Sequence, residues 1–254
     1  ILVMIRNLSL KSGNPALNIK AFKHLSGVSD DPMTLNGVVN KTAICLGLLM
    51  LAAIFGYLLD SSSLYGITIF AGLAGLGIVI LTNFKKHLAP YTAPVYAIVE
   101  GIFLGMVSSA VSAVYGNIVA HAVFITLGIF GVMLFLYKSR IIKVTQKFKL
   151  GMAAALGGIF IFYLINFIIF MFNPSSTFAV MQFDNGSWFS IGFSVVIVII
   201  ASLTLVLDFE RIEEGCKYGS PKYMEWYGAL GLMVTLAWIY FEVLRLLTKL
   251  NSRN

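Results

Sequence analysis

The chain has 254 residues, of which 59% are hydrophobic and only 11% are charged, and its mean hydropathy is +0.90. A water-soluble domain carries about 25% charged residues, so this composition excludes a soluble fold and predicts an integral membrane protein. The net charge of +7 does not indicate nucleic acid as a partner, because the cations lie in short clusters between apolar runs, as membrane topology requires. Two cysteines, Cys45 and Cys216, are too few for a disulfide framework or a metal site.

Seven apolar segments are each long enough to cross a bilayer, which takes roughly 20 residues. They are about Val38–Leu59, Leu64–Phe84, Ala93–Tyr115, Ile118–Tyr137, Leu150–Phe172, Trp188–Leu207 and Tyr227–Thr248. Short polar breaks separate them, and no remaining stretch fits a soluble domain. The sequence therefore predicts an all-α polytopic membrane protein. Its expected parts are an N-terminal arm over residues 1–37, a seven-helix transmembrane domain over residues 38–250 and a C-terminal tail over residues 251–254.

Lysines and arginines are distributed unevenly between the two sides of the predicted bundle. Fifteen lie in the N-terminal arm and in the stretches that follow the second, fourth and sixth segments, and the three alternate loops have none. Cytoplasmic loops carry the excess of Lys and Arg, so we expect the N-terminus to be cytoplasmic. Complete crossing by the seventh segment would put the C-terminus outside, where Arg245, Lys249 and Arg253 break the rule. A re-entrant last segment, which returns the tail to the cytoplasm, is the alternative.

A polar stretch, Leu207–Gly215, separates the last two apolar segments. It contains four acids and one arginine. We interpret it as a hinge in which Gly215 marks a helix end, because glycine is common just after the last helical residue.

Three acids, Glu100, Asp208 and Glu242, lie in or at the edge of the apolar segments, where an acid costs at least a few kcal/mol. At the rise of an α-helix, Glu100 and Asp208 both lie roughly 10 Å from the cytoplasmic ends of their helices, whereas Glu242 lies about 30 Å along the last one. Straight helices therefore couple Glu100 with Asp208 more readily than Asp208 with Glu242. A tilted or unwound last helix would bring the second pair together.

Carboxylates that lie close together in a low dielectric bind protons as a coupled unit, and in their ionised form they offer hard oxygen ligands to Ca²⁺. Glu100, Asp208 and Glu242 are therefore candidate residues for proton sensing, for an ion pathway and for Ca²⁺ binding. The alternative is that these acids are structural and pair with nearby cations. The candidate charge partners are Lys85, Lys86 and Arg211 for Asp208, and Arg245 for Glu242.

Motifs of enzymatic catalysis do not occur in the chain. There is no Ser/His/Asp arrangement, phosphate-binding glycine loop, HExxH or CxxC. The isolated histidines His87 and His121 are better explained as solvated or interfacial residues than as metal ligands. We therefore expect neither enzymatic activity nor a bound cofactor, and Ca²⁺ enters only as a candidate transported ion.

Five short motifs, spread over essentially the whole chain, resemble those of a known family. They are Asn14–Asn18, Met33–Ala43, Glu100–Gly105, Leu207–Phe209 and Tyr240–Leu247. Together with the seven apolar segments, they resemble the Bax inhibitor-1 family, in its bacterial branch with a long N-terminus.

The resemblance implies a bundle in which six spans surround a central seventh, in the inner membrane of a bacterium. It also implies a pH-sensitive passive Ca²⁺ leak, in which protons act on a pair of carboxylates from the sixth and seventh spans. Carried over to this chain, the pair is Asp208 and Glu242. In some members a cation near the cytoplasmic end of the second span contacts the pair, and Lys85 or Lys86 stands nearest here.

This chain departs from the family in the spacing of the pair. Asp208 and Glu242 are 34 positions apart, which is a longer connection than the family has. Matching Gly228–Leu230 to the family's small-residue stretch puts Thr235 opposite Asp208 and Glu242 two turns beyond. The chain would then pair Asp208 with Glu100, or hold Glu242 as a separate outer site.

Two functions from different classes follow from these observations. The first is a passive cation leak that is gated by protonation of intramembrane carboxylates. The second is a membrane regulator that transports nothing and binds a membrane partner, such as a membrane protease, through the arm Arg6–Asp31. A proton-coupled transporter is a third hypothesis, but no pair of broken helices or repeated halves indicates it.

Overall fold

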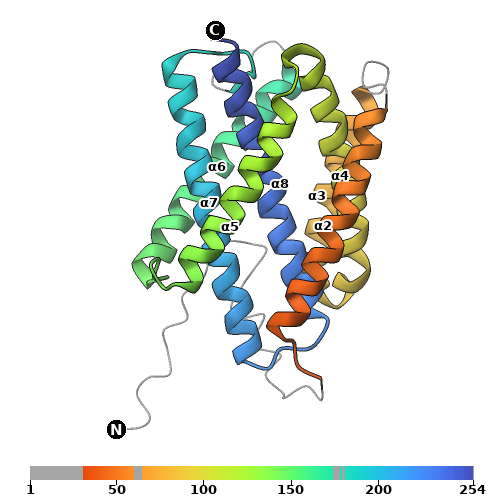
Figure 1. Cartoon of the computed structure of the whole chain (residues 1–254), viewed down its shortest axis with the longest axis vertical. Coiled ribbons are helices and arrows are strands. Elements are labelled where there is room, and N and C mark those ends of the chain that lie inside the picture. The colour runs from red at the N-terminus through yellow and green to blue at the C-terminus, as the bar shows by residue number, and fades with distance from the viewer. Residues whose placement is uncertain (1–30, 60–64, 174–177, 179–180, 254) are drawn as a thin grey trace.

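The computed structural model describes residues 31–59, 65–173, 178 and 181–253, and these residues form seven long helices and no strand (Figure 1). The helices are α2 (Leu35–Leu58), α3 (Tyr65–Phe84), α4 (Ala89–Tyr115), α5 (Ile118–Lys138), α6 (Gln146–Phe172), α7 (Trp188–Lys217) and α8 (Met224–Asn251). All seven are long and apolar enough to cross a membrane, which confirms the predicted all-α polytopic architecture. Most of the expected arm 1–37, and the polar break over residues 60–63, lie outside the described residues.

The two ends of the bundle differ in charge. We call the end where α2 begins the near end and the end where α8 finishes the far end (Figure 1). The connections from α3 to α4, from α5 to α6 and from α7 to α8 all lie at the near end. The lysines and arginines in or next to these connections are Lys85, Lys86, Lys138, Arg140, Lys143, Lys147, Lys149, Lys217 and Lys222. The sequence predicted that connections with lysines and arginines alternate with connections that have none, and in the structure this is an alternation between the two ends.

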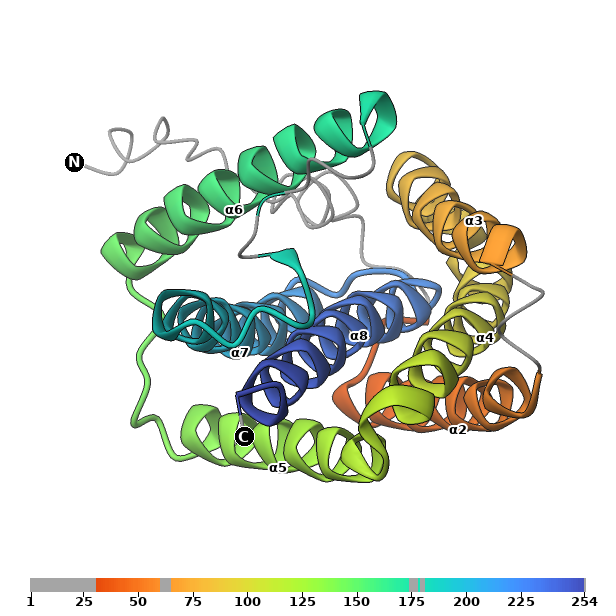
Figure 2. The ribbon, with the colours of Figure 1, turned by 90° about the horizontal axis from the view of Figure 1, so that it is seen from above.

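Helix α8 lies at the centre of the bundle, as the view from above shows (Figure 2). It packs against α2, α4, α5 and α7, and it has the largest buried share of the seven helices. Four of the six buried charged residues of the described chain belong to α8, whereas the outer helices expose large apolar side chains such as Leu58, Phe84 and Phe172. Hydrocarbon accepts apolar side chains but not charges, so the helix with the most buried charges lies innermost. The expected arrangement of six helices around a central seventh is confirmed.

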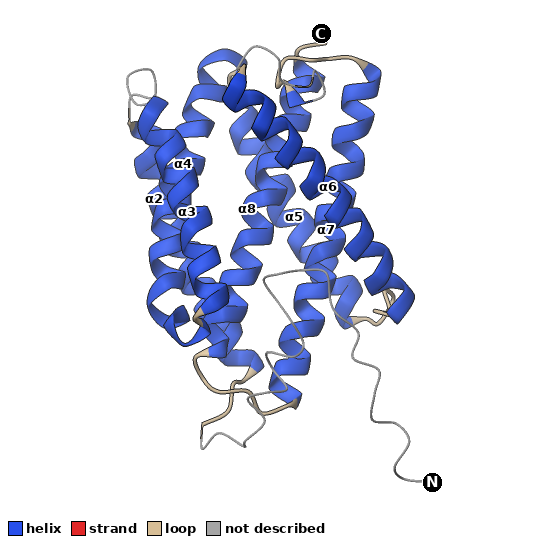
Figure 3. Ribbon diagram, turned by 180° about the vertical axis from the view of Figure 1, so that it is seen from behind, coloured by secondary structure: helices blue, strands red, loops and turns tan. Residues whose placement is uncertain are grey.

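Helix α6 is the least buried of the seven helices. It packs chiefly against α7 and slants across the back of the bundle (Figure 3). Side chains at its two ends tie it to the helices beside it. At the near end the Lys149 ammonium lies 2.7 Å from the Glu210 carboxylate of α7. Towards the far end the Tyr163 hydroxyl donates a hydrogen bond to Glu242 of α8.

The interpretation of Leu207–Gly215 as a hinge is wrong, because α7 continues through this stretch and ends at Lys217. Ion pairs stabilise the helix here. The Lys217 ammonium lies 2.7 Å from the Glu213 carboxylate one turn earlier, at the spacing that favours a helix. The acids of this stretch therefore extend α7 beyond its apolar part instead of ending it.

Helix α8 is one uninterrupted helix of 28 residues, from Met224 at the near end to Asn251 at the far end. At the rise of an α-helix this length is about 42 Å, which exceeds the thickness of the hydrocarbon layer. Of the two alternatives for the last segment, a re-entrant segment is not found, because one continuous helix runs from the near end to the far end. The cations Arg245 and Lys249 are buried inside the bundle, so they are not loop charges, and a rule about loops does not apply to them.

Glycines allow α2 and α4 to pack with their backbones in contact. A Cβ atom added at Gly105 of α4 would lie 2.8 Å from the backbone nitrogen of Tyr57, and one added at Gly56 of α2 would lie 2.9 Å from the Cα atom of Ile102. In lipid, small residues at such crossings replace the hydrophobic effect as a source of helix association.

We expect Gly105→Ala to destabilise the protein by about 1–3 kcal/mol, the usual cost of overpacking, because the methyl group meets the backbone of α2. The matched control is Gly128→Ala on α5, where nothing lies within 4 Å of an added Cβ atom. That change should be neutral or slightly stabilising, since alanine is the better helix former by about 1 kcal/mol. Thermal unfolding in detergent measures both. Equal effects would contradict the described α2–α4 contact.

Candidate functional site

Asp208 is a buried acid at the contact between α7 and α8, with only 2% of its surface exposed. Its carboxylate accepts a hydrogen bond of 2.6 Å from the Thr235 hydroxyl of α8. It also accepts one of 3.4 Å from the Arg211 guanidinium, one turn further along α7. Thr235 is the residue that the match of Gly228–Leu230 puts opposite Asp208, and that contact is confirmed. We call the three residues Asp208, Thr235 and Arg211 the Asp208 contact.

Local helix geometry explains how the Asp208 contact forms. Asp208 and Arg211 are three residues apart, which puts both side chains on one face of α7. The two helices approach closely because Gly228 of α8 has no side chain: an added Cβ atom would lie 3.2 Å from Ile212. A buried charge that loses its partner costs about 3–5 kcal/mol. Asp208 therefore depends on a cation from its own helix and a hydroxyl from the next.

The two lysines expected near Asp208 do not contact it in the described structure. The Lys86 ammonium lies 5.5 Å from the centre of the Tyr227 ring, and the Tyr227 hydroxyl donates a hydrogen bond of 3.1 Å to Asn83. Lys85 forms the cap that precedes a short 3-10 helix, Lys86–Leu88. Of the three expected charge partners of Asp208, the structure brings only Arg211 to it.

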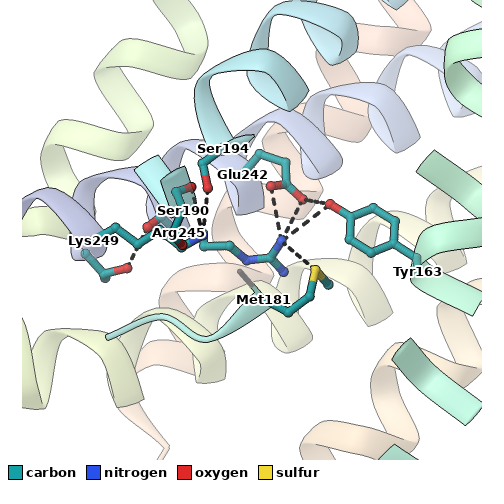
Figure 4. Close-up of polar contacts among 8 residues, drawn as sticks. Tyr163, Met181, Ser190, Ser194, Glu242, Arg245 and Lys249 are labelled. Atoms are coloured by element: carbon teal, nitrogen blue, oxygen red, sulfur yellow. Dashed lines mark hydrogen bonds and ion pairs between the residues drawn. The ribbon is translucent and has the colours of Figure 1, made fainter. Parts of the chain in front are cut away.

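Glu242 is also buried, with 1% of its surface exposed, and it belongs to a second polar cluster towards the far end (Figure 4). Arg245 Nη1 lies 3.2 Å and 3.3 Å from the two carboxylate oxygens of Glu242, so the expected partner is present. The Tyr163 hydroxyl of α6 donates a hydrogen bond of 2.5 Å to the same carboxylate. The connection between α6 and α7 reaches the cluster through Met181, whose sulfur lies 3.8 Å from Arg245.

Glu100 lies on α4 and faces α3. A Cβ atom added at Gly75 would lie 2.7 Å from the Glu100 carboxylate, so this glycine leaves room for the acid. Within the described residues the Glu100 carboxylate has no hydrogen bond or ion pair. The structure therefore does not couple Glu100 with Asp208, although the two acids were expected at a similar depth.

The three candidate acids lie apart and not in one constellation. In the described part of the chain, no hydrogen bond joins any two of them, and no group of three or more His, Cys, Asp or Glu side chains is arranged to hold a metal ion. Each acid instead has its own surroundings, and of the three acids Asp208 is the one whose contact joins α7 to α8. A Ca²⁺ site built from Glu100, Asp208 and Glu242 together is not formed.

Residues 14–252, nearly the whole chain, match a protein family that is described as Bax inhibitor 1 like. The chain belongs to this family. It is therefore a multi-pass membrane protein of the Bax inhibitor family. No match was found among curated proteins.

In this Bax inhibitor 1 like protein, the pair of acids carried over from the resemblance is not a contact. The partner of Asp208 across the α7–α8 interface is the neutral Thr235, and Glu242 lies seven residues further along α8 with Arg245 as its own cation. The position opposite Asp208 thus holds a hydroxyl, and Glu242 lies two turns further towards the far end. Of the two arrangements that the sequence left open, the structure shows a separate site for Glu242.

Glu225 is a buried charged residue that sequence reasoning missed. It lies in the first turn of α8, its side chain is fully buried, and it forms an ion pair with Lys41 of α2. The backbone nitrogen and the hydroxyl of Thr34 donate hydrogen bonds of 2.8 Å and 3.0 Å to it. The seventh apolar segment was expected to begin at Tyr227, which left Glu225 in a loop. The available signal was an acid at a helix start, where the helix dipole favours negative charge.

We expect Asp208→Asn and Thr235→Val to destabilise the Bax inhibitor 1 like protein non-additively, with a coupling free energy of about 1–3 kcal/mol. The first change removes the charge of the acceptor, and the second removes the hydroxyl that donates to it. Chemical unfolding of the two single variants and the double variant in detergent measures this coupling. Thr126→Val is the matched control, since within the described ranges the Thr126 hydroxyl donates only to the Ala122 carbonyl of its own helix. Additive effects of Asp208→Asn and Thr235→Val would contradict the contact.

Proposed function

We propose that this protein is a passive, pH-sensitive cation leak, with Ca²⁺ as the transported ion and the Asp208 contact as the element that protons act on. The observation that supports the proposal is a buried carboxylate that joins two helices through its charge and its oxygen atoms. No catalytic chemistry and no cofactor are part of the proposed activity.

The charge of Asp208 bears directly on how α7 and α8 pack. The ionised carboxylate is an acceptor for Thr235 and a counter-ion for Arg211. Protonation removes the counter-ion and leaves Arg211, of which 7% is exposed, as a buried charge without its partner. Such a loss costs about 3–5 kcal/mol, which is enough to favour a different packing of the two helices. In the proposal, the ionised state holds the helices closed and acidification weakens their contact.

The chemistry of the contact suits the passage of a hard cation and not its storage. Ca²⁺ prefers carboxylate, hydroxyl and carbonyl oxygen atoms and takes six to eight of them in stable sites. Asp208 and Thr235 supply fewer oxygen ligands than that. Conduction needs sites that bind an ion weakly enough to release it, so an incomplete ligand set is consistent with a leak.

We also propose that the protein lies in the inner membrane of a bacterium with its near end in the cytoplasm. The support is the gathering of loop lysines and arginines at the near end, because cytoplasmic loops carry the excess of such residues. In this orientation Asp208 is reached from the cytoplasm and Glu242 lies towards the opposite face.

We expect the wild-type protein in vesicles to pass Ca²⁺ faster as the pH falls between about pH 8 and pH 6, because protonation of Asp208 weakens the α7–α8 contact. Asp208→Asn removes the charge and keeps the shape of the side chain. It should raise the flux at the alkaline end to the acid level and abolish most of the pH dependence. A Ca²⁺-sensitive dye inside the vesicles measures the flux.

The matched control for this experiment is Asp184→Asn, the same chemical change at an exposed aspartate in the connection between α6 and α7. Its flux should follow the wild type at every pH. If Asp208→Asn and Asp184→Asn both keep the wild-type pH dependence, the proposal fails.

A second candidate function is a regulator that binds a membrane partner. The observation that favours it is that the first described residues contact the turn between α7 and α8. The Met33 backbone nitrogen donates a hydrogen bond of 2.7 Å to the Ser220 carbonyl in the turn between α7 and α8. The Asp31 carboxylate accepts one of 3.1 Å from Lys222 and thereby raises the pKa of that ammonium. A partner that pulls on the preceding arm would thus act on the start of α8.

If the regulator proposal holds, a variant that lacks residues 1–30 loses association with a co-expressed membrane protease in detergent, because the arm is the part that a partner engages outside the bilayer. If the leak proposal holds, this variant keeps the wild-type Ca²⁺ flux, because residues 31–34 retain their contacts with the α7–α8 turn and the start of α8. Association that survives the deletion contradicts the regulator proposal. Loss of both association and flux would indicate a folding defect, which thermal unfolding identifies.

A further inference from the structure

A groove with a volume of about 290 Å³ enters the bundle between α2 and α5 and reaches the central helix. In the view of Figure 1, α8 is visible between these two helices. Helices α2 and α5 form the walls of the groove, and α4 and α8 form its floor. The floor consists of buried side chains, among them Leu104, Ser108, Leu236, Ala237 and Tyr240.

The mouth of the groove lies on the outer surface of the bundle. Exposed apolar side chains stand there, Met50 and Ile54 on α2 and Leu127 on α5. All four helices that line the groove are long and apolar enough to span a membrane, so the medium outside the mouth is lipid. The groove therefore gives the hydrocarbon of the bilayer access to α8, a helix that the rest of the bundle encloses.

The groove is about as long as one leaflet of the bilayer is deep. Along α2 its lining runs from Leu46 to Tyr57, which is about 16 Å at the rise of an α-helix. The hydrocarbon core of a bilayer is about 30 Å thick, so one leaflet takes about half of that. On α5 the lining runs from Val119 to Leu127, in the half of the helix that begins at the far end. The groove therefore lies in the leaflet at the far end.

The hydroxyl groups that line the groove have partners within the protein. Tyr240 and Ser108 share a hydrogen bond of 2.6 Å, and Thr126 donates one of 2.8 Å to a carbonyl of its own helix. The Tyr57 hydroxyl, in the last turn of α2, donates one of 3.0 Å to Ser112. Tyrosines are enriched at membrane interfaces, so Tyr57 marks the end of the groove that is nearest to lipid head groups. The rest of the groove presents an apolar surface, which suits hydrocarbon and not a polar ligand.

The volume of the groove fits a hydrocarbon chain. An apolar cavity of about 150 Å³ takes the six carbon atoms of benzene and stays free of water. At the same density, 290 Å³ has room for about twelve carbon atoms. A helix from a second copy of the chain is too large, because at a width of about 10 Å it would fill roughly 1,200 Å³ over the same length. An acyl chain is narrow enough and restores the van der Waals contacts that an empty groove would lose.

We propose that the groove between α2 and α5 binds one acyl chain of a membrane lipid from the leaflet at the far end, with the lipid head group next to Tyr57. The bound chain contacts Leu236, Ala237 and Tyr240, and it thereby makes lipid a direct neighbour of the central helix. The inference does not depend on the proposed leak, because the site is defined by shape, depth and apolar lining alone.

The test uses the full-length protein in vesicles that contain a phospholipid whose acyl chain carries a diazirine. Illumination joins the chain to the residues that it contacts, and mass spectrometry of peptides locates the label. We expect label within 236–240 of α8, in addition to label at outward-facing residues such as Phe172 of α6, which is 87% exposed. A lipid that stays outside the bundle reaches Phe172 but not the floor of the groove.

Larger side chains on either wall should fill the groove and exclude the lipid. Val123→Phe on α5 and Ala53→Leu on α2 are expected to remove most of the label from α8 and to leave the label on α6. The matched controls are Val132→Phe on α5 and Ala43→Leu on α2, the same changes at exposed positions outside the groove. Both controls should keep the wild-type pattern of label.

Label on α6 without label on α8 in the wild type would overturn the inference, and so would label on α8 that both filled variants retain. If α8 is unlabelled and the protein is a dimer in detergent that Val123→Phe converts to a monomer, a second copy covers the groove and the lipid site is refuted. Thermal unfolding identifies a filled variant that does not fold. The variant on the opposite wall, together with the wild-type pattern, then decides the outcome.

Discussion

The architecture depends on the cost of placing charge inside a hydrocarbon layer. Each buried charge needs a partner within the protein, because a charged side chain at the bilayer centre costs at least a few kcal/mol. The bundle meets this need by enclosing α8, which carries Glu225, Glu242, Arg245 and Lys249 among the helices around it. The order of the helices in space follows from this constraint. Apolar helices lie outside, and the helix with the most charge lies in the middle.

Three buried acids take part in contacts of α8 at different depths, and they join it to different neighbours. Glu225 at the near end fastens α8 to the start of α2. Thr235, further along, joins α8 to α7 through Asp208, and Glu242 joins it to α6 through Tyr163. A change of protonation at any of these acids therefore affects a different neighbour of the same helix. Of these three, the Asp208 contact is the one that joins α8 to α7, the helix whose buried share is nearest to that of α8.

The sequence was sufficient to predict the fold, because runs of roughly 20 apolar residues have few alternatives in a membrane. It also predicted the pairing of Thr235 with Asp208, since a match of small residues sets the antiparallel register of two helices. The sequence did not predict that α7 continues through its charged C-terminal part. Leu207–Gly215 has the composition of a hinge, but in the structure Lys149 and Lys217 form ion pairs with its acids, and the stretch is helical. The depth of a residue along a straight helix also does not say which neighbouring helix it faces. Glu100 was expected near Asp208 of α7, but it faces Gly75 of α3.

Asp208 contacts Thr235, and Ser194 contacts Lys249 fourteen residues further along each helix. The two pairs share one antiparallel register, which has a consequence for how α7 and α8 stay aligned. An apolar heptad pattern alone would tolerate slippage by one repeat, because the same shapes meet again after seven residues. Here a slip of one repeat would set Asp208 against Glu242 and move Thr235 away from its acid. Two acids would then face each other, while Lys249 would meet Ala201 in place of Ser194. The buried charges thus make sliding costly and leave tilting or separation as the accessible motions of this helix pair.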